Sequence, residues 1–282
     1  MVANTHPYSK ESPYYSTGTH LREKHKQVRF TSGRQFHEWA LDLLPISPSS
    51  KILDAGCGWG RFTWHAVDQK GASPANIVCS DRSINMLKTL VEEKNRRSAP
   101  VKVVASDIEA IPLSSEQFDI AMANHVLYHV TNIDKGAHEL SRMMKSDGIF
   151  LATTNSDNVE VTIVKLHYQA LQALGVDFEP EAPSPFSMEN GGAYLERAFQ
   201  EVAVYYFEDT TIYDNADEFV NMYLSIGRYR NFIARGDIDQ SIKEALPRLY
   251  RDLVQEIIDR EGKLVTPVLM GAFVCTRPRR SS

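Results

Sequence analysis

Three glycines at alternate positions follow an apolar run that ends in an acidic residue, in the stretch ILDAGCGWG (52–60). Because glycine has no Cβ, Gly56, Gly58 and Gly60 allow the backbone to approach a bound molecule closely. A helix-like stretch begins at Arg61, and the first turn of a helix offers free N–H groups to a polar ligand. The pattern therefore predicts a ligand site built from a strand, a bare loop and a helix N-terminus.

The spacing of these glycines separates the ligand classes that use such a loop. The dinucleotide fingerprint G-x-G-x-x-G requires a third glycine at position 61, where Arg61 stands. The phosphate-binding loop G-x-x-x-x-G-K-[ST] is also absent, because no Lys-Ser or Lys-Thr pair follows the turn. The spacing argues against a nicotinamide-dependent oxidoreductase and against a phosphate ligand.

Strand-like and helix-like segments alternate around this loop. The segments expected as strands are 51–55, 76–80, 101–106, 118–124 and 148–155. The segments expected as helices between them are 61–71, 84–97 and 134–145. This alternation predicts an α/β fold with a Rossmann-like, doubly wound and mostly parallel sheet, because parallel strands need a crossover connection. Two later strands, 199–213 and 264–278, bring the predicted sheet to seven strands.

The segments outside this core predict an N-terminal helical arm and a helical lid. The further segments expected as helices are 21–44, 159–175, 191–199, 216–232 and 239–260. The predicted organisation is an arm and helix covering the site (1–48), a ligand-binding core (49–155), a late strand with a helical substrate lid (156–264), and a last strand with a tail (265–282). The final RPRRSS is expected to be a solvated end.

Several segments in the predicted core carry a resemblance to a known family. They are LDAGCGWG, VCSDRSINML, ASDIEAIPLSSEQFDIAMANHVLYHV and ELSRMMKSDGIFLATT. Together, over roughly residues 50–155, they resemble the class I S-adenosylmethionine-dependent methyltransferases, in particular small-molecule members of the type 11 or ubiquinone-biosynthesis kind. Ser146-Asp147-Gly148 replaces the usual Pro-Gly-Gly, and residues 1–49 and 156–264 match nothing specific in the family.

The resemblance implies that S-adenosylmethionine is the cofactor, that S-adenosylhomocysteine is its product, and that no metal is needed. Under it, Asp81 accepts hydrogen bonds from both ribose hydroxyls, Asp107 accepts one from the adenine amino group, and Asp54 supports the turn and the cationic amino end of the cofactor. The residues assigned to the cofactor are Asp54, Gly56, Cys57, Gly58, Gly60, Asp81, Arg82, Met86, Asp107, Ile108 and Asn124. Alternatives stay open: Asp81 as a helix N-cap, Asp107 as an ordinary loop residue, and Met86 as a core residue.

Candidate catalytic residues follow from the chemistry of methyl transfer. In-line displacement depends first on alignment, and a hydroxyl or carbon nucleophile also profits from a general base. His125 and His129 follow the fourth predicted strand, at the edge where open α/β sheets bind ligands, and Tyr15 lies in the N-terminal arm. These three are the predicted catalytic residues, with a packing role as the alternative for each.

Aromatic residues are the candidates for an acceptor pocket, since an aromatic face stabilises a cationic sulfonium by about 0.5–2 kcal/mol. The predicted substrate-binding residues are Tyr14, Tyr128, Phe186, Tyr223 and Tyr229. Arg228 and Arg230 flank Tyr229 and suit a substrate carboxylate, although a solvated helix face is the favoured interpretation.

Composition excludes several classes of function. The 282 residues carry 31 Lys and Arg against 36 Asp and Glu, and the net charge of −5 argues against nucleic acid as a partner. The three cysteines have no metal-ligand spacing, and their odd number gives no disulfide framework, so a reducing compartment is expected. Without a signal-like apolar segment or a membrane-spanning run, a cytoplasmic protein is predicted. A homodimer is compatible with the sequence.

The function predicted from these features is methyl transfer from S-adenosylmethionine to the N, O or C atom of a small aromatic or heteroaromatic metabolite, in a role such as secondary metabolism. An RNA or protein methyltransferase is one alternative, although it would favour a basic added domain or an Asn-Pro-Pro-Tyr motif where NHVLY stands. A catalytically silent cofactor-binding protein is the other alternative.

Overall fold

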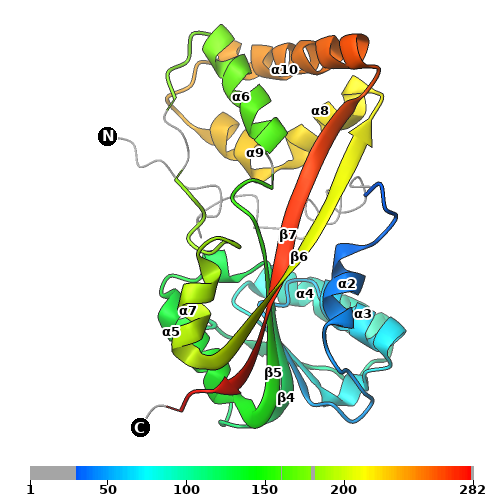
Figure 1. The fold of residues 1–282 in the computed structure, drawn as a ribbon, viewed down its shortest axis with the longest axis vertical. Helices are drawn as coiled ribbons and strands as arrows, with labels where there is room; N and C mark the ends of the chain where they lie inside the picture. Colours follow the sequence, from blue (N-terminus) through cyan, green and yellow to red (C-terminus); the bar gives the residue numbers. More distant parts are fainter. Residues whose placement is uncertain (1–29, 160, 179–181, 281–282) are drawn as a thin grey trace. The chain divides into compact units, whose positions relative to one another are not determined.

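The structure is a computed structural model that describes residues 30–159, 161–178 and 182–280 (Figure 1). The chain divides into two compact units, each assembled from separate segments. The core unit contains residues 34–157, 184–207 and 269–280, and the helical unit contains residues 30–33, 158–183 and 208–268. The predicted boundary after residue 155 lies close to the division after Asp157, whereas the one after residue 264 lies inside the helical unit.

Among the described residues, seven strands form one sheet in the order β3-β2-β1-β4-β5-β7-β6. The strands are β1 (Ile52–Ala55), β2 (Ile77–Asp81), β3 (Lys102–Ala105), β4 (Phe118–Asn124), β5 (Met144–Asn155), β6 (Phe199–Tyr213) and β7 (Leu264–Pro278). β1 to β5 pair in parallel, and β7 pairs antiparallel with β5. The predicted α/β fold with a doubly wound, mostly parallel sheet is therefore confirmed.

Burial explains why these segments are strands. All four residues of β1 are buried, and β4 is buried at most positions, as expected for parallel strands covered on both faces. β5 begins four residues earlier than predicted because Met144 pairs with Phe118, after which the register shifts. The parallel arrangement brings the carboxyl ends of β1, β2 and β4 to one edge of the sheet.

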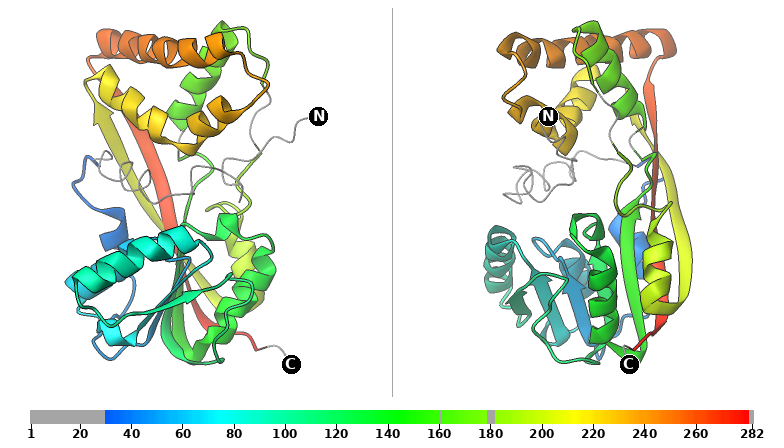
Figure 2. Two further views of the ribbon diagram at one scale, coloured as in Figure 1. Left: turned by 180° about the vertical axis from the view of Figure 1, so that it is seen from behind. Right: turned by 90° about the vertical axis from the view of Figure 1, so that its left-hand side faces the viewer.

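Helices cover both faces of the sheet in the core unit. They are α2 (Phe36–Asp42), α3 (Arg61–Lys70), α4 (Ile84–Arg96), α5 (Ile133–Met143) and α7 (Gly191–Ala198), with short 3-10 turns η2 (Pro74–Asn76) and η3 (Leu127–His129). α2 packs against α3, and α5 packs against α7. Figures 1 and 2 show these two pairs on opposite sides of the sheet.

The helix predicted over residues 21–44 is wrong in its described part, because α2 begins only at Phe36. Phe30 instead forms a bridge with Thr211 of β6, and Gly33 adopts a left-handed φ of 73°. The hydroxyl of Thr31 donates to Asp209, which further holds this stretch out of a helical path. Residues 21–29 lie outside the described residues.

The helical unit contains α6 (Val161–Ala173), α8 (Ala216–Ser225), α9 (Gly227–Ala234) and α10 (Gln240–Glu261). α10 packs against both α6 and α8, around a core that includes Phe219, Tyr223 and Tyr250. The single helix predicted over 216–232 is two helices, because Ile226 is extended with φ −84° and ψ 157°. Among the described helices, none combines the length and the hydrophobicity that a membrane span requires.

The described arginines of the C-terminal tail are exposed, as predicted for a solvated end, but two of them also hydrogen-bond to backbone carbonyls of the core unit. Arg279 Nε donates to the carbonyl of Glu196 at 3.2 Å, near the end of α7. Arg280 donates to the carbonyls of Ser141 and Met144 at 3.1 and 2.9 Å, at the end of α5. The last carbonyls of a helix have no partner within it and carry partial negative charge, so the two guanidinium groups satisfy both helix ends.

Arg280→Ala is expected to lower the free energy of unfolding by about 1–3 kcal/mol, because two charge-assisted hydrogen bonds are lost. Arg277→Ala is the matched control, since its side chain is 66% exposed and pairs with Glu201 at 3.2 Å. Such an exposed pair contributes about 1 kcal/mol or less. Urea unfolding curves measure both variants, and equal losses would contradict the contribution of these hydrogen bonds.

Candidate functional site

The glycine loop is fixed over the end of β2 by backbone hydrogen bonds. The N–H groups of Gly56 and Cys57 donate to the carbonyl of Ser80 at 2.7 and 3.0 Å. The N–H of Gly60 donates to the carbonyl of Cys57 at 2.9 Å and closes the turn before α3. Gly56, Gly58 and Gly60 have φ values of 70°, 55° and 86°, a left-handed region that favours glycine.

The three glycines have different surroundings. A Cβ added at Gly56 would lie 2.3 Å from Val126 Cγ2, and one at Gly60 would lie 2.9 Å from Trp64 Nε1. A Cβ added at Gly58 would meet no heavy atom within 4 Å. Close packing therefore requires Gly56 and Gly60, whereas Gly58 presents bare backbone to open space.

Asp81 ends β2 and connects the glycine loop to α4. Its Oδ2 accepts the N–H of Gly58 at 2.8 Å, and its Oδ1 accepts the N–H of Ser83 at 2.8 Å. The N-cap of α4 is Ser83, whose hydroxyl accepts from Met86, so the N-cap alternative for Asp81 is wrong. Burial raises the pKa of Asp81. Each carboxylate oxygen keeps a lone pair for a further donor.

Asp54 lies inside β1, beneath the loop, with 1% of its surface exposed. Its Oδ2 accepts the hydroxyl hydrogen of Thr63 in α3 at 2.6 Å, and that hydroxyl lies 3.3 Å from Cys79 Sγ. Burial raises the pKa of Asp54 from 3.8 to about 6, although the hydrogen bond from Thr63 opposes the shift. Asp54 thus ties β1 to the first turn of α3.

The raised pKa of Asp54 predicts a pH dependence of stability. A carboxyl group that binds its proton more tightly when folded stabilises the protein at low pH, and this contribution is lost as pH rises from 3.8 through about 6. The free energy of unfolding of Asp54→Asn relative to wild type should therefore rise by about 2–3 kcal/mol between these pH values. Urea unfolding at a series of pH values tests this, and a difference that does not change with pH would contradict it.

The other residues predicted to bind the cofactor differ in how much of their side chain is exposed. Asp107 is half-buried after β3 and its Oδ1 accepts the N–H of Glu109 at 3.0 Å. Ile108 and Met86 are 5% exposed each, so both contribute mainly to packing. Arg82 is exposed, and Cys57 is 8% exposed.

Asn124 and His125 end β4 beside the glycine loop. Asn124 Oδ1 accepts from Thr153 at 3.2 Å, while its buried Nδ2 has no hydrogen-bond partner. His125 has a left-handed φ of 50°, and its N–H donates to the carbonyl of Thr153 at 3.0 Å. Since Val126 packs on Gly56, the structure brings the end of β4 against the loop.

His129 lies farther along, in the 3-10 turn η3. Its N–H donates to the carbonyl of Val126 at 2.8 Å, and its ring lies 4.5 Å from that of Tyr128. Tyr128 is half-buried and packs against the core of the unit. His129 and Tyr128 thus accompany His125 at the carboxyl end of β4.

Two predicted substrate residues are core residues in the structure. Phe186 has no exposed surface and packs in the core unit, 5.8 Å from the ring of Phe273. Tyr223 has no exposed surface either and stacks on Tyr250 in the helical unit at 3.7 Å. Neither side chain presents surface to a ligand, because each fills the interior of its own unit.

Three further tyrosines were predicted to bind the substrate or to act in catalysis. Tyr229 is half-buried in the helical unit, 5.2 Å from the ring of Tyr223. Tyr14 and Tyr15 lie outside the described residues. The described structure therefore gathers the glycine loop, Asp81 and the end of β4 in the core unit, and gives no geometry for the predicted aromatic arm.

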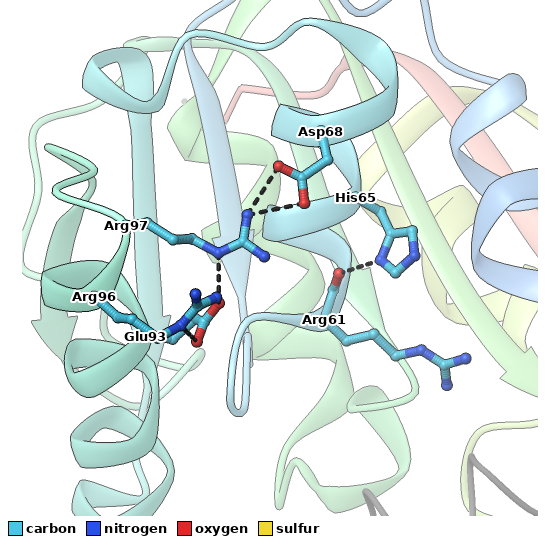
Figure 3. Close-up of polar contacts among 6 residues, drawn as sticks. All are labelled: Arg61, His65, Asp68, Glu93, Arg96 and Arg97. Atoms are coloured by element: carbon cyan, nitrogen blue, oxygen red, sulfur yellow. Dashed lines mark hydrogen bonds and ion pairs between the residues drawn. The ribbon is translucent and has the colours of Figure 1, made fainter.

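His37, Glu38 and His65 have candidate metal-ligand atoms within 4.8 Å of one another. Arg61 Nη2 lies 2.9 Å from His37 Nδ1, and Figure 3 shows its side chain extending from the start of α3. Because a guanidinium only donates, His37 Nδ1 accepts and the ring hydrogen lies on Nε2. The hydrogen on Nε2 and the positive charge of Arg61 both disfavour the binding of a metal cation here. Burial also lowers the pKa of His37 to about 3. We interpret the group as a polar contact between α2 and α3.

A second polar network joins α3 to α4 (Figure 3). Arg97 Nη1 donates to both carboxylate oxygens of Asp68 at 2.8 Å, and Arg97 also donates to Glu93. Its guanidinium carbon lies 4.8 Å from the centre of the Trp64 ring. The network holds together the two helices that follow the glycine loop and Asp81.

Sequence reasoning missed three residues that fix the loop: Thr63, Ser80 and Val126. Ser80 acts through its carbonyl, which no side-chain pattern reveals. Val126 acts by contact with Gly56 across two strands, which needs the fold to be known. The sequence did offer a signal for Thr63, which is a hydroxyl residue in the first turn of the helix after the loop. A side chain at that position can face the preceding strand, where Asp54 accepts its hydrogen bond.

Comparisons with known proteins agree with this geometry. Residues 53–152 match the model of a methyltransferase domain family. Malonyl-[acyl-carrier protein] O-methyltransferase of Enterobacter lignolyticus is 26% identical over 147 residues, which cover 52% of this chain and 51% of that protein. The chain spans about half the length of the curated relatives that it first matches.

Solved structures share the fold at low sequence identity. The YcgJ protein of Bacillus subtilis has a TM-score of 0.55 and 13% identity, covering 87% of this chain and 98% of that one. Phosphoethanolamine N-methyltransferase 2 of Haemonchus contortus, solved with phosphomonomethylethanolamine and S-adenosylhomocysteine, has a TM-score of 0.50 and 17% identity, covering 86% of this chain and 52% of that one. Residues 53–152 therefore form a methyltransferase domain of the class I, S-adenosylmethionine-dependent kind, and the solved structures share its fold.

Proposed function

We propose that the protein binds S-adenosylmethionine at the glycine loop and transfers its methyl group to a small aromatic or heteroaromatic acceptor. The observation that carries this proposal is the bare backbone of Gly58 facing open space while its N–H is held by Asp81 at 2.8 Å. A flat nucleoside fits against such backbone, and the neighbouring carboxylate suits the paired hydroxyls of a ribose. These residues therefore fit the cofactor that the family uses.

Each residue of the loop region has a separate part in holding the cofactor. Gly58 gives close approach, the free N–H groups at the start of α3 suit a carboxylate, and Asp81 accepts from the ribose. Asp107, at the end of the neighbouring strand β3, is the proposed acceptor for the adenine amino group. Asp54 acts from below by bonding Thr63, so that the first turn of α3 keeps its place under the loop.

The chemistry needs alignment and, for some acceptors, a base. When bound, S-adenosylmethionine supplies a methyl group activated by a positively charged sulfur. His125 and His129 lie at the carboxyl end of β4, where they are proposed to remove a proton from an acceptor hydroxyl or carbon. An amine acceptor needs only alignment, so histidine dependence would indicate an oxygen or carbon acceptor.

The acceptor class is tested by turnover. The purified protein is incubated with S-adenosylmethionine and a panel of phenols, heteroaromatic amines, carboxylic acids, RNA and protein, and S-adenosylhomocysteine is measured by mass spectrometry. Turnover confined to small aromatic acceptors supports the proposal, and turnover with RNA or protein alone would overturn it. Tight cofactor binding without turnover on any acceptor would favour a catalytically silent protein.

Variants of the two histidines assign the base. At least one of His125→Ala and His129→Ala is expected to lose turnover by about a hundredfold or more, because general base catalysis contributes that much. Calorimetric titration should show unchanged affinity for the cofactor in the same variant. Two fully active variants would remove both histidines from the reaction.

A further inference from the structure

The backbone of His125 is held in a conformation that this residue type rarely adopts. Its φ is 50°, in the left-handed region, and its N–H donates to the carbonyl of Thr153 at 3.0 Å. A non-glycine residue in this conformation costs roughly 1–2 kcal/mol, so contacts with the surrounding residues must offset that cost. The starting direction of the imidazole is therefore fixed by β5.

The imidazole of His125 packs against Phe36, the first residue of α2. The two ring centres lie 5.1 Å apart, with an angle of 52° between their planes. Phe36 is 7% exposed, and its ring centre also lies 5.4 Å from that of Phe207 of β6, with the two rings perpendicular. Phe207 itself has no exposed surface. Phe36 thus contacts both a buried strand residue and His125, all within the core unit.

Trp39 belongs to the same aromatic cluster but takes a different part in it. Its ring lies 5.4 Å from Phe36 and 5.3 Å from Phe207, one turn along α2. Among the described residues those two are its ring contacts, so Trp39 anchors α2 without a ring contact to the histidine. The cluster therefore offers a residue that contacts His125 and a half-buried aromatic neighbour on the same helix for which no ring contact with His125 is seen.

We propose that Phe36 is a positioning residue for His125 and that it couples the docking of α2 to the orientation of the base. The backbone conformation sets where the imidazole begins, and the Phe36 ring restricts the side-chain rotamers that it adopts. Aromatic pairs at this separation contribute about 0.5–1.5 kcal/mol beyond burial, which favours one rotamer by about two- to twelvefold. This inference rests on the proposed function, in which His125 acts on the acceptor.

A helix that precedes the glycine loop in sequence thereby acts on the reaction without touching the reacting atoms. His125 needs an orientation that reaches the acceptor proton, and a base displaced by about 1 Å loses much of its effect. Undocking of α2 removes the Phe36 contact and leaves the loop hydrogen bonds to Ser80 and Asp81 intact. Loss of turnover without loss of cofactor affinity is therefore the specific consequence.

The test compares Phe36→Leu with Trp39→Leu in the full-length protein. The Cε1–H resonance of His125 is identified by its absence from the spectrum of His125→Ala and followed by NMR. In Phe36→Leu it is expected to shift and broaden, because the ring current and the packing restraint are both lost. In Trp39→Leu it should stay close to its wild-type position. Phe36→Met repeats the test with an unbranched side chain that fills more of the cavity.

Kinetics with the acceptor found by turnover screening complete the test. Phe36→Leu is expected to lose about tenfold or more in kcat, with KM and cofactor affinity within about threefold of wild type. Trp39→Leu should retain kcat within about threefold. An unchanged His125 resonance and kcat in folded Phe36→Leu or Phe36→Met, with His125→Ala inactive, would overturn the inference alone. A fully active His125→Ala would instead overturn the role of His125 in the proposed function.

Discussion

Replacing Gly56 with alanine is expected to lower the free energy of unfolding by about 2–5 kcal/mol, a large share of the roughly 5–15 kcal/mol of a typical domain. The new Cβ would lie 2.3 Å from Val126 Cγ2 and 2.8 Å from Val126 Cβ, so rotation of the valine cannot relieve the overlap. The φ of 70° adds the cost of a left-handed alanine. Urea unfolding monitored by circular dichroism measures the loss.

The matched control is Gly58→Ala, which has a φ of 55° and no heavy atom within 4 Å of its new Cβ. It should lose only about 1–2 kcal/mol of stability. Because the methyl group enters the space proposed for the cofactor, affinity should fall at least tenfold, about 1.4 kcal/mol. Adding Val126→Ala to Gly56→Ala should restore part of the lost stability. Equal stability losses at Gly56 and Gly58, or wild-type affinity in Gly58→Ala, would contradict the different roles assigned to the two glycines.

Asp81→Ala is expected to weaken S-adenosylmethionine binding at least tenfold, about 1.4 kcal/mol, in calorimetric titrations. The substitution removes the acceptor for the Gly58 and Ser83 N–H groups, each at 2.8 Å, together with the proposed acceptor for the ribose hydroxyls. The loop therefore loses its brace at the same time as the ligand loses its carboxylate. Asp81→Asn keeps one acceptor oxygen and should give an intermediate affinity.

Asp119→Ala controls for the loss of an aspartate that also bonds backbone. Asp119 lies near the start of β4, at the opposite end of the strand from Asn124, and accepts the N–H of Lys51 at 2.8 Å. It also pairs with Lys145 at 2.5 Å. This variant should lose stability and keep its cofactor affinity. A folded Asp81→Ala that binds as tightly as Asp119→Ala would remove Asp81 from the site.

The central part of the sheet was predictable because β1 and β4 are short, mostly apolar and mostly buried runs. The bounds of β6 and β7 coincide with the predicted segments 199–213 and 264–278, since both runs end at turns or polar residues. The start of α2 was not predictable from periodicity, because Phe30 and Thr31 find partners in β6, far away in sequence. Hydrogen bonds to distant segments override a local helical pattern.

The residues of the candidate site also fall into a group that the sequence predicts and a group that it does not. Glycine positions and the acidic residues that end strands depend on local backbone geometry, and the structure brings Gly58 and Asp81 together as the motif implies. Aromatic residues carry no such local signal, since a phenylalanine in a pocket and one in a core look alike in sequence. Phe186 and Tyr223 were therefore placed in the substrate pocket, although both are fully buried. The predicted roles of Tyr14 and Tyr15 and the predicted homodimer stay predictions.

The position of β7 between β5 and β6 has a consequence for biosynthesis. β6 leaves the ribosome before the strand that must separate it from β5 has been made, so during synthesis both strands expose unpaired edges. A chain interrupted before Leu264 would keep those edges open and be prone to self-association, whatever the state of its glycine loop. The link between β5 and β6 in the sheet therefore waits for β7 to be translated.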